Sequence, residues 1–180
     1  MKQTLRPEIL ETSRLRLRPL RASDALAIFG YASDPQVTKQ VRFVTHRNLH
    51  DTRSFLRHVR QRRSKDCVWG IELKSARRVI GSIGLLDYAP EHHRAELGYA
   101  LHREHWNRGI ATEAVRAVIN HAMRKLRINR LEAGTYLSNR ASQRVLEKCG
   151  FKFEGVLRQR ELIKGSYRDQ RFYSLLRREL

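Results

Sequence analysis

The stretch AELGYALHREHWNRGIATEAVRAVINHAMRKL, residues 95–126, decides the fold because its hydrophobic period changes in the middle. Over residues 95–101 apolar side chains recur at every second position, which is typical of a strand with one buried face. From Ile110 to Leu126 the apolar positions follow helical spacing over about four turns. The sequence therefore predicts a strand, a short connection and a long helix.

The residues before this stretch predict a strand and two helices. Arg and Leu alternate over residues 14–20, which indicates an opening strand. Ser23 or Asp24 is expected to cap a short helix, which Asp34-Pro35 ends. A second helix is expected to begin near Asp51-Thr52, where apolar side chains return at helical spacing.

The remaining segments complete an α/β domain with a largely antiparallel sheet. A helix is predicted over residues 139–148, with Asn139 as its cap and Gly150 at its end, because glycine readily adopts the positive φ of a helix C-terminus. Further strands are predicted over residues 68–73, 79–86, 130–136, 151–157 and 170–176, the first two and the last two as hairpins. Neither a repeat nor a linker divides the chain, so residues 1–180 are expected to form one domain.

The composition favours a cytoplasmic protein without a membrane span. No apolar stretch reaches the roughly 18 residues of a membrane helix, and the first residues lack the apolar run of a secretory signal. Cys67 and Cys149 are the only cysteines. Their spacing fits neither a disulfide framework nor a zinc site, so we expect reduced thiols.

The net charge is +19, from 37 Lys and Arg against 18 Asp and Glu. This charge favours acidic partners, including phosphate ligands and nucleic acid, although a merely solvated basic surface explains it equally well. The basic run RQRRSK, residues 60–65, is the main argument for RNA contact. Since no aromatic-rich RNA-binding motif or zinc finger accompanies it, we expect at most a weak contact.

The connection Trp106-Asn107-Arg108-Gly109-Ile110-Ala111 leads into the long helix and is suited to hold an anion. The first N–H groups of a helix have no partner within the helix, and the partial positive charge there favours phosphate. Gly109 and Ala111 leave room for a phosphate to approach the backbone. By itself, however, the segment is better explained by ordinary turn chemistry.

Four ordered motifs give this turn its meaning: Glu96 to Tyr99, Trp106 to Ala114, Asn139 to Ser142 and Glu147 to Phe151. Together they closely resemble the GCN5-related N-acetyltransferase (GNAT) superfamily, and within it the ribosomal-protein alanine/serine acetyltransferases, the RimJ/RimL-like branch. The opening residues 12–18 and the closing residues 165–176 also resemble that branch. The resemblance implies the GNAT fold, a mixed, largely antiparallel sheet of about six or seven strands flanked by helices.

The resemblance also implies acetyl-CoA as cosubstrate, and no metal. Backbone amides of residues 107–112 would hold the pyrophosphate, while the pantetheine arm would pair with the strand over residues 99–101. The implied coenzyme-binding residues are Tyr99, Ala100, Leu101, Trp106, Asn107, Arg108, Gly109, Ile110, Ala111, Thr112 and Asn139. The superfamily often has Gln or Arg where Trp106 stands, and Gly where Asn107 stands. Because backbone groups do the binding, neither difference should abolish it.

Acetyl transfer to an amine needs a base and a donor to the developing oxyanion. By resemblance, an amide near Tyr99 polarises the thioester, and the transfer is direct, without a covalent enzyme intermediate. Glu161 is the first candidate for the base. Glu96, acting through a water molecule, is the second. Either carboxylate is equally well explained as an ordinary solvated or ion-paired surface group.

The departing thiolate also needs a proton. Ser142 is the first candidate for this acid, with Tyr136 and Tyr167 as alternatives. Ser142 lies one turn after Asn139, however, which is also the place of a simple capping partner.

The expected acceptor is the N-terminal α-amine of a ribosomal or other protein, bound between the two early helices and the last hairpin. An α-amine has a pKa of roughly 8 and loses its proton far more readily than a lysine side chain near 10.4. The alternatives are a small amine, such as an antibiotic or a polyamine, and a non-enzymatic RNA-binding protein. A metal site at His92-His93 or at His102 and His105 lacks partners at ligand spacing. The oligomeric state stays open between a monomer and a homodimer.

Overall fold

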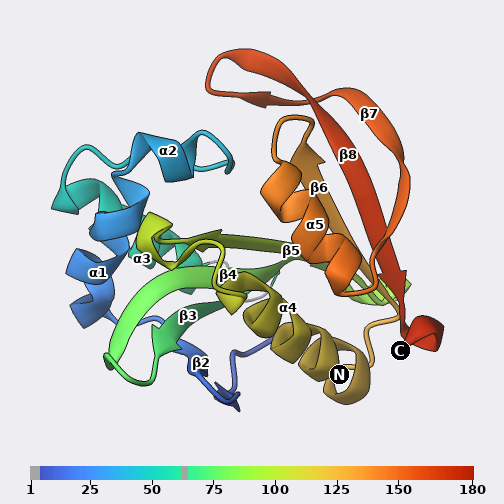
Figure 1. Ribbon diagram of the computed structural model, residues 1–180, viewed down its shortest axis with the longest axis horizontal. Coiled ribbons are helices and arrows are strands. Elements are labelled where there is room, and N and C mark those ends of the chain that lie inside the picture. The colour runs from blue at the N-terminus through green and yellow to red at the C-terminus, as the bar shows by residue number, and fades with distance from the viewer. Residues whose placement is uncertain (1–4, 62–64) are drawn as a thin grey trace.

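An eight-stranded sheet forms the centre of the molecule, in the order β1-β2-β3-β4-β5-β6-β8-β7 (Figure 1). The computed structural model describes residues 5–61 and 65–180. Its strands are β1 (Leu10–Glu11), β2 (Leu15–Pro19), β3 (Cys67–Leu73), β4 (Arg78–Ala89), β5 (Arg94–Leu101), β6 (Arg130–Tyr136), β7 (Lys152–Ile163) and β8 (Ser166–Leu176). Neighbouring strands are antiparallel except β5 and β6. The predicted mixed, largely antiparallel fold is confirmed, with one strand more than the resemblance implied because β1 pairs with β2.

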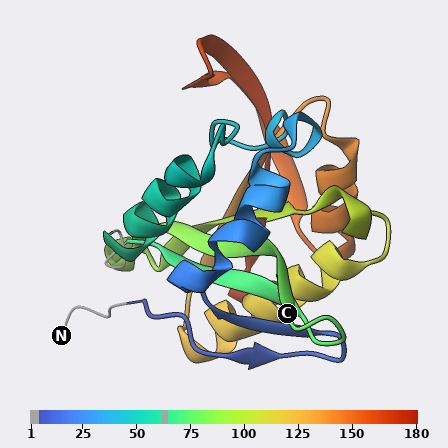
Figure 2. The same cartoon turned by 90° about the vertical axis from the view of Figure 1, so that its left-hand side faces the viewer.

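Helices cover both faces of this sheet. The helices are α1 (Ala25–Ala32), α2 (Pro35–Thr38), α3 (Leu49–Gln61), α4 (Ile110–Asn120) and α5 (Arg140–Lys148). Figure 2 shows α1 and α3 on one side of β3 and β4, with α4 on the other. Each side has its own apolar core: Ile28 and Leu56 pack in the first, and Val115 and Leu146 in the second. Within the described residues, no helix is long and apolar enough to cross a membrane.

Two helix predictions were wrong in detail. The long helix does not continue to Leu126 as an α-helix, because α4 ends at Asn120 and the chain widens into a π-helical turn over His121–Lys125. The predicted apolar face is nevertheless buried. Nor does the Asp24 side chain cap α1. Its carboxylate is held instead by the Arg18 guanidinium, at 2.8 and 2.9 Å, and by the backbone N–H of Arg21 at 2.7 Å.

The feature that opens the sheet is the pairing of β5 with β6. These parallel strands are in register over only three pairs, from Arg94 opposite Arg130 to Glu96 opposite Glu132. Beyond Glu96 the two strands diverge, as Figure 1 shows. A strand edge that has lost its neighbour leaves backbone N–H and C=O groups free to bind something else.

Candidate functional site

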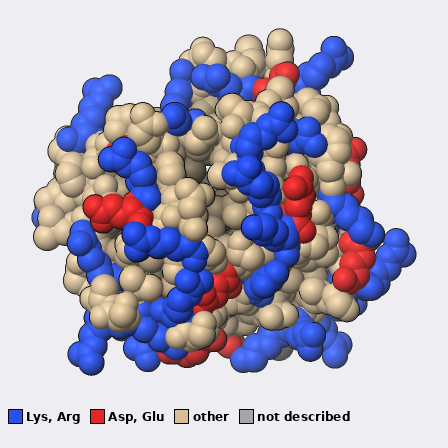
Figure 3. Space-filling view, viewed as in Figure 1, with Lys and Arg blue, Asp and Glu red and all other residues tan. Residues whose placement is uncertain are grey.

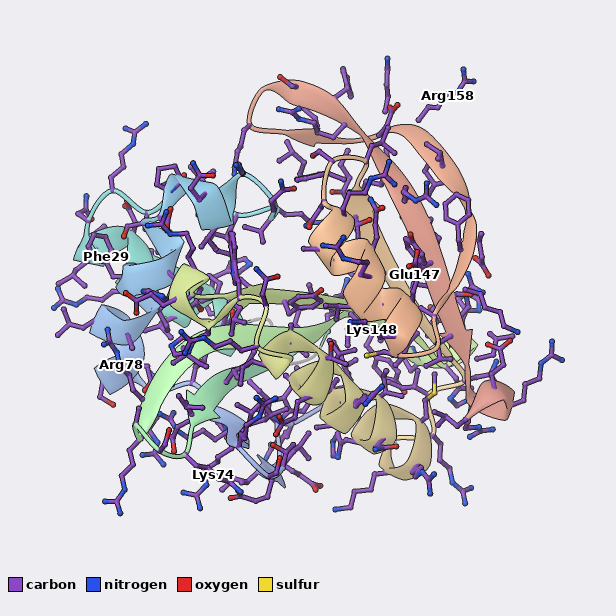
Figure 4. The ribbon with its side chains drawn as sticks, in the orientation of Figure 1. Phe29, Lys74, Arg78, Glu147, Lys148 and Arg158 are labelled. Atoms are coloured by element: carbon purple, nitrogen blue, oxygen red, sulfur yellow. The ribbon has the colours of Figure 1, made fainter. Side chains whose placement is uncertain are left out.

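A cleft of about 800 Å³ occupies the space where β5 and β6 separate. It is lined by residues 97–101 of β5, residues 133–136 of β6, the turn before α4, the first residues of α5 and the loop over residues 39–43. Figure 3 shows a hollow near the middle of this face, bordered by Lys and Arg side chains. Lys148, at the end of α5 that lies towards α4, belongs to the lining (Figure 4).

The open edge of β5 presents the backbone of Tyr99 to the cleft. On the other edge of this strand, His102 N donates to Ile80 O at 2.8 Å. Because backbone groups alternate between the two edges of a strand, those of Tyr99 and Leu101 point away from β4. Trp106 Nε1 already donates to Leu101 O at 2.8 Å, so the indole ties the turn to the strand end.

The turn before α4 directs helix amides towards the same cleft. Asn107 and Gly109 adopt positive φ values of 57° and 74°, which asparagine and glycine tolerate better than other residues. The first N–H groups of α4 follow directly and have no acceptor within the helix. The predicted turn and helix start are therefore present beside the cleft.

Glu113, in the first turn of α4, anchors this turn to the start of the chain. Its carboxylate accepts hydrogen bonds from Thr12 Oγ1 at 2.6 Å, Ser13 Oγ at 3.1 Å and Arg14 Nε at 2.7 Å. Arg14 also donates to Arg108 O at 2.9 Å. Burial alone would raise the pKa of Glu113, but these donors outweigh it and lower the pKa to about 2. The sequence analysis missed this contact, since nothing local links residues a hundred positions apart.

Ser142 and Tyr99 meet inside the cleft. Ser142 Oγ lies 2.9 Å from Tyr99 Oη, and burial raises the pKa of Tyr99 to about 12. Asn139 caps α5 through its Oδ1, which accepts from the backbone N–H of Ser142 at 3.1 Å. The cap therefore uses the serine backbone and leaves its hydroxyl available for the tyrosine.

Arg42 brings the two candidate bases together. Its Nη2 lies 2.5 Å from Glu96 Oε1 and 2.9 Å from Glu161 Oε1. Gln170, which is buried on β8, donates from Nε2 to Glu161 Oε2 at 3.1 Å. Burial raises the pKa of Glu96, and Arg42 opposes this shift. Neither Arg42 nor Gln170 was predicted, because no spacing in the sequence relates them to the glutamates.

Most of the predicted residues line the cleft, and the exceptions have clear positions. Arg108 is exposed and does not line the cleft. Its carbonyl oxygen accepts a hydrogen bond from Arg14. Glu161 lies behind the lining, in contact with Arg42 and Gln170. Tyr136 lines the cleft. Tyr167 is 65% exposed near the end of the last hairpin.

Three further predictions concern a metal site, the two cysteines and the basic run over residues 60–65. Within the described ranges, no three His, Cys, Asp or Glu side chains are grouped to hold a metal ion. Cys67 and Cys149 are free thiols. Residues 62–64 of the basic run lie outside the described residues.

Comparison with known proteins gives one family. A family model described as an acetyltransferase (GNAT) domain matches residues 14–152. The chain is 35% identical over 171 residues to the uncharacterized N-acetyltransferase YoaA of Bacillus subtilis (strain 168), which covers 94% of this chain and 97% of that one.

Solved structures share the fold over nearly the whole chain. A GNAT-family acetyltransferase from Bacillus anthracis has a TM-score of 0.86 and 26% identity, covering 96% of this chain and 100% of that one. RimL, named as a ribosomal L7/L12 α-N-protein acetyltransferase and solved with coenzyme A, has a TM-score of 0.84 and 21% identity, covering 94% and 98%. At that identity the likeness to RimL is one of fold.

Proposed function

This chain belongs to the GNAT family of acetyltransferases, and from that premise we propose that it transfers the acetyl group of acetyl-CoA directly to the N-terminal α-amine of a ribosomal or other protein. The observation that carries the proposal is the gap between β5 and β6. It brings the amides at the start of α4, a free strand edge and the Glu96 carboxylate to one cleft, with Glu161 held behind its lining by Arg42.

The coenzyme is proposed to enter along the turn before α4. Its pyrophosphate would bind the backbone amides of residues 107–112, where the helix dipole favours negative charge. The pantetheine arm would pair with the free edge of β5 at Tyr99 and Leu101, beside Asn139. Basic side chains that line this part of the cleft, Arg140, Arg144 and Lys148, add attraction for phosphate. RimL, with a related fold, was solved with coenzyme A.

The transfer step needs three groups around the thioester. The amine nitrogen attacks the carbonyl carbon, and the Tyr99 N–H donates to the carbonyl oxygen as negative charge develops there. The carbon–sulfur bond then breaks, and Ser142 gives a proton to the departing thiolate. Tyr99 supports this role, because its hydroxyl lies 2.9 Å from Ser142 Oγ and can pass a proton to Ser142 as Ser142 gives up its own. Burial raises the pKa of Tyr99, so the tyrosinate then regains its proton from water.

The amine loses its proton to a carboxylate of the Arg42 cluster, which consists of Arg42, Glu96 and Glu161. Glu161 is our first choice and Glu96, through a water molecule, the second. Two carboxylates share one guanidinium here, so this contact holds more carboxylates than cations, although Lys39 and Lys164 lie on or against the neighbouring loop. An arriving ammonium group would be attracted there. The same observation favours a second candidate acceptor, a small polyamine.

Release of free coenzyme A thiol tests the function. Purified protein is mixed with acetyl-CoA and, in turn, with peptides bearing a free α-amine, the same peptides with a blocked α-amine and a free lysine, and spermidine. We expect turnover with free α-amines only. Turnover of spermidine alone would replace the proposed acceptor, and no turnover with any amine would contradict transfer to amines.

Three variants test the assigned roles. We expect Glu161→Gln to lower kcat by about a hundredfold and Ser142→Ala by about tenfold, since thiolates leave readily, with the KM for acetyl-CoA nearly unchanged. The control is Glu154→Gln, because Glu154 pairs with Arg130 and Ser174 away from the cleft.

If Glu161→Gln keeps its rate while Glu96→Gln loses it, the base is Glu96. An unchanged rate in Ser142→Ala removes that residue from the mechanism.

A further inference from the structure

Partly buried apolar side chains line the end of the cleft beside Glu96. They come from the loop after α2, from α3, from β3 and from β4: Val41, Phe43, Phe55, Val68 and Leu86. Each is only partly buried, so each presents apolar surface to the cleft. Apolar surface gathered in a concave site usually marks the place of an apolar ligand group.

The floor of this region is formed by two glycines. Gly84 of β4 and Gly98 of β5 are cross-strand partners, and both line the cleft. A methyl group added at Gly84 would crowd Val68 Cγ2 at 3.1 Å. One added at Gly98 would meet only Leu86 Cδ1, at 3.3 Å, within 4 Å. Open space therefore lies above Gly98.

Three aromatic rings pack together on one side of this space. The rings of Phe43 and Phe55 lie 6.1 Å apart, and the ring of His46 lies 5.7 Å from the first and 5.8 Å from the second. His46 is buried, its Nδ1 lies 3.0 Å from Thr52 Oγ1, and its backbone N–H donates to Ala32 O at 2.9 Å. The two phenylalanine rings therefore pack against each other and against a buried histidine.

The space above Gly98 also has a defined relation to the acceptor amine. Glu96 and Gly98 are two residues apart on β5 and share one face of the sheet. Leu86 lies opposite Glu96 on β4. An amine bound at the Arg42 cluster can therefore place the substituent on its own carbon over Gly98.

We propose that Val41, Phe43, Phe55, Val68 and Leu86, above Gly98, form an apolar pocket that binds a large apolar side chain on the carbon bearing the acceptor amine. The acceptor class is then a protein N-terminus whose first residue is Leu, Ile, Met or Phe. Alanine would leave the pocket partly empty. Serine or aspartate would lose hydration there without gaining a partner. The pocket assignment rests on the proposed function, because it requires an α-amine acceptor.

The test uses peptides of the form Xaa-Ala-Ala-Gly with a free α-amine, where Xaa is Leu, Met, Phe, Ala, Ser or Asp. We expect kcat/KM for the Leu and Met peptides to exceed that for the Ala and Ser peptides by at least about tenfold, since several additional methylene groups become buried. The KM for acetyl-CoA should be the same with every peptide.

Two variants alter the pocket in different ways. Gly98→Val fills the space above the floor, so the ratio of kcat/KM for the Leu peptide to kcat/KM for the Ala peptide should fall by about tenfold. Phe55→Ala removes part of the aromatic side and should lower kcat/KM for the Phe peptide most. Leu26→Ala is the control, because Leu26 is 70% exposed on α1 and does not line the cleft. Melting temperatures show whether the Phe55 variant still folds, and Gly98→Val stands as an independent test if it does not.

The results of these experiments distinguish failure of the pocket proposal from failure of the proposed function. Equal rates for the Leu and Ala peptides, or a Leu preference that survives Gly98→Val, would overturn the pocket while leaving α-amine transfer intact. Acetylation of spermidine and of no peptide would overturn the proposed function itself.

Discussion

Arg42 holds two glutamates that the sequence keeps far apart, and this contact sets the charge at the acceptor end of the cleft. Glu96 comes from β5 and Glu161 from β7. Removing Arg42 would leave two carboxylates facing each other with no cation between them, which is unfavourable in a partly buried site. Burial raises the pKa of Glu96, and the arginine opposes that rise.

Glu113 provides a residue-scale prediction about stability. Its pKa is about 2 in the fold against an ordinary value of 4.5, so its stabilising contribution is complete above pH 4.5 and is lost as the pH falls towards 2. We expect Glu113→Gln to lower the melting temperature at pH 7 by roughly 5 °C. The difference from the unaltered protein should shrink between pH 4.5 and 2 in thermal unfolding followed by circular dichroism.

The matched control for Glu113 is Glu11→Gln. Glu11 also pairs with basic side chains, but it is exposed and should change the melting temperature little. A Glu113 variant as stable as this control at pH 7 would show that the contact with residues 12–14 does not anchor α4.

At the scale of elements, the first turn of α4, rather than the length of the helix, is the part that we expect to bind the coenzyme. Gly109 has a φ of 74°, where an added Cβ is strained. We expect Gly109→Ala to destabilise the fold by about 1 kcal/mol and to raise the KM for acetyl-CoA several-fold, because relieving the strain turns the helix amides away from the phosphates. Steady-state kinetics at saturating acceptor measures this KM.

Gly165 supplies the control for Gly109. It has a φ of 77° in the turn between β7 and β8, and nothing lies within 4 Å of an added Cβ. Gly165→Ala should therefore cost similar stability without changing the KM for acetyl-CoA. Equal KM values for the two variants would remove the turn before α4 from the coenzyme site.

The elements differed in how far local sequence could predict them. The start of α4, the Asn139 cap and the strand over residues 130–136 follow from short-range rules, and the structure confirms them. The π-helical turn at His121–Lys125 does not, because its apolar positions also fit α-helical spacing. Arg42, Gln170 and the apolar pocket join the site only through strand register and the folding of the loop after α2, which no local pattern encodes.

At the scale of the whole molecule, the basic net charge differs from the charge of the Arg42 contact, where two carboxylates meet one guanidinium. The net charge of +19 suits a protein that meets phosphate, either on the coenzyme or on an RNA-bearing partner. The Arg42 cluster is a local exception at the acceptor end. Under the proposed function, we expect the coenzyme phosphates and the acceptor amine to bind in different parts of one cleft.

The most direct test of this account locates the transferred acetyl group. Protein, acetyl-CoA and a peptide that carries both a free α-amine and a lysine are incubated, and tandem mass spectrometry identifies the modified nitrogen. The account predicts one acetyl group on the α-nitrogen and a rate reduced by Glu161→Gln or, if that glutamate is not the base, by Glu96→Gln. Acetylation of the lysine alone, or an equal rate in both variants and the unaltered protein, would contradict it.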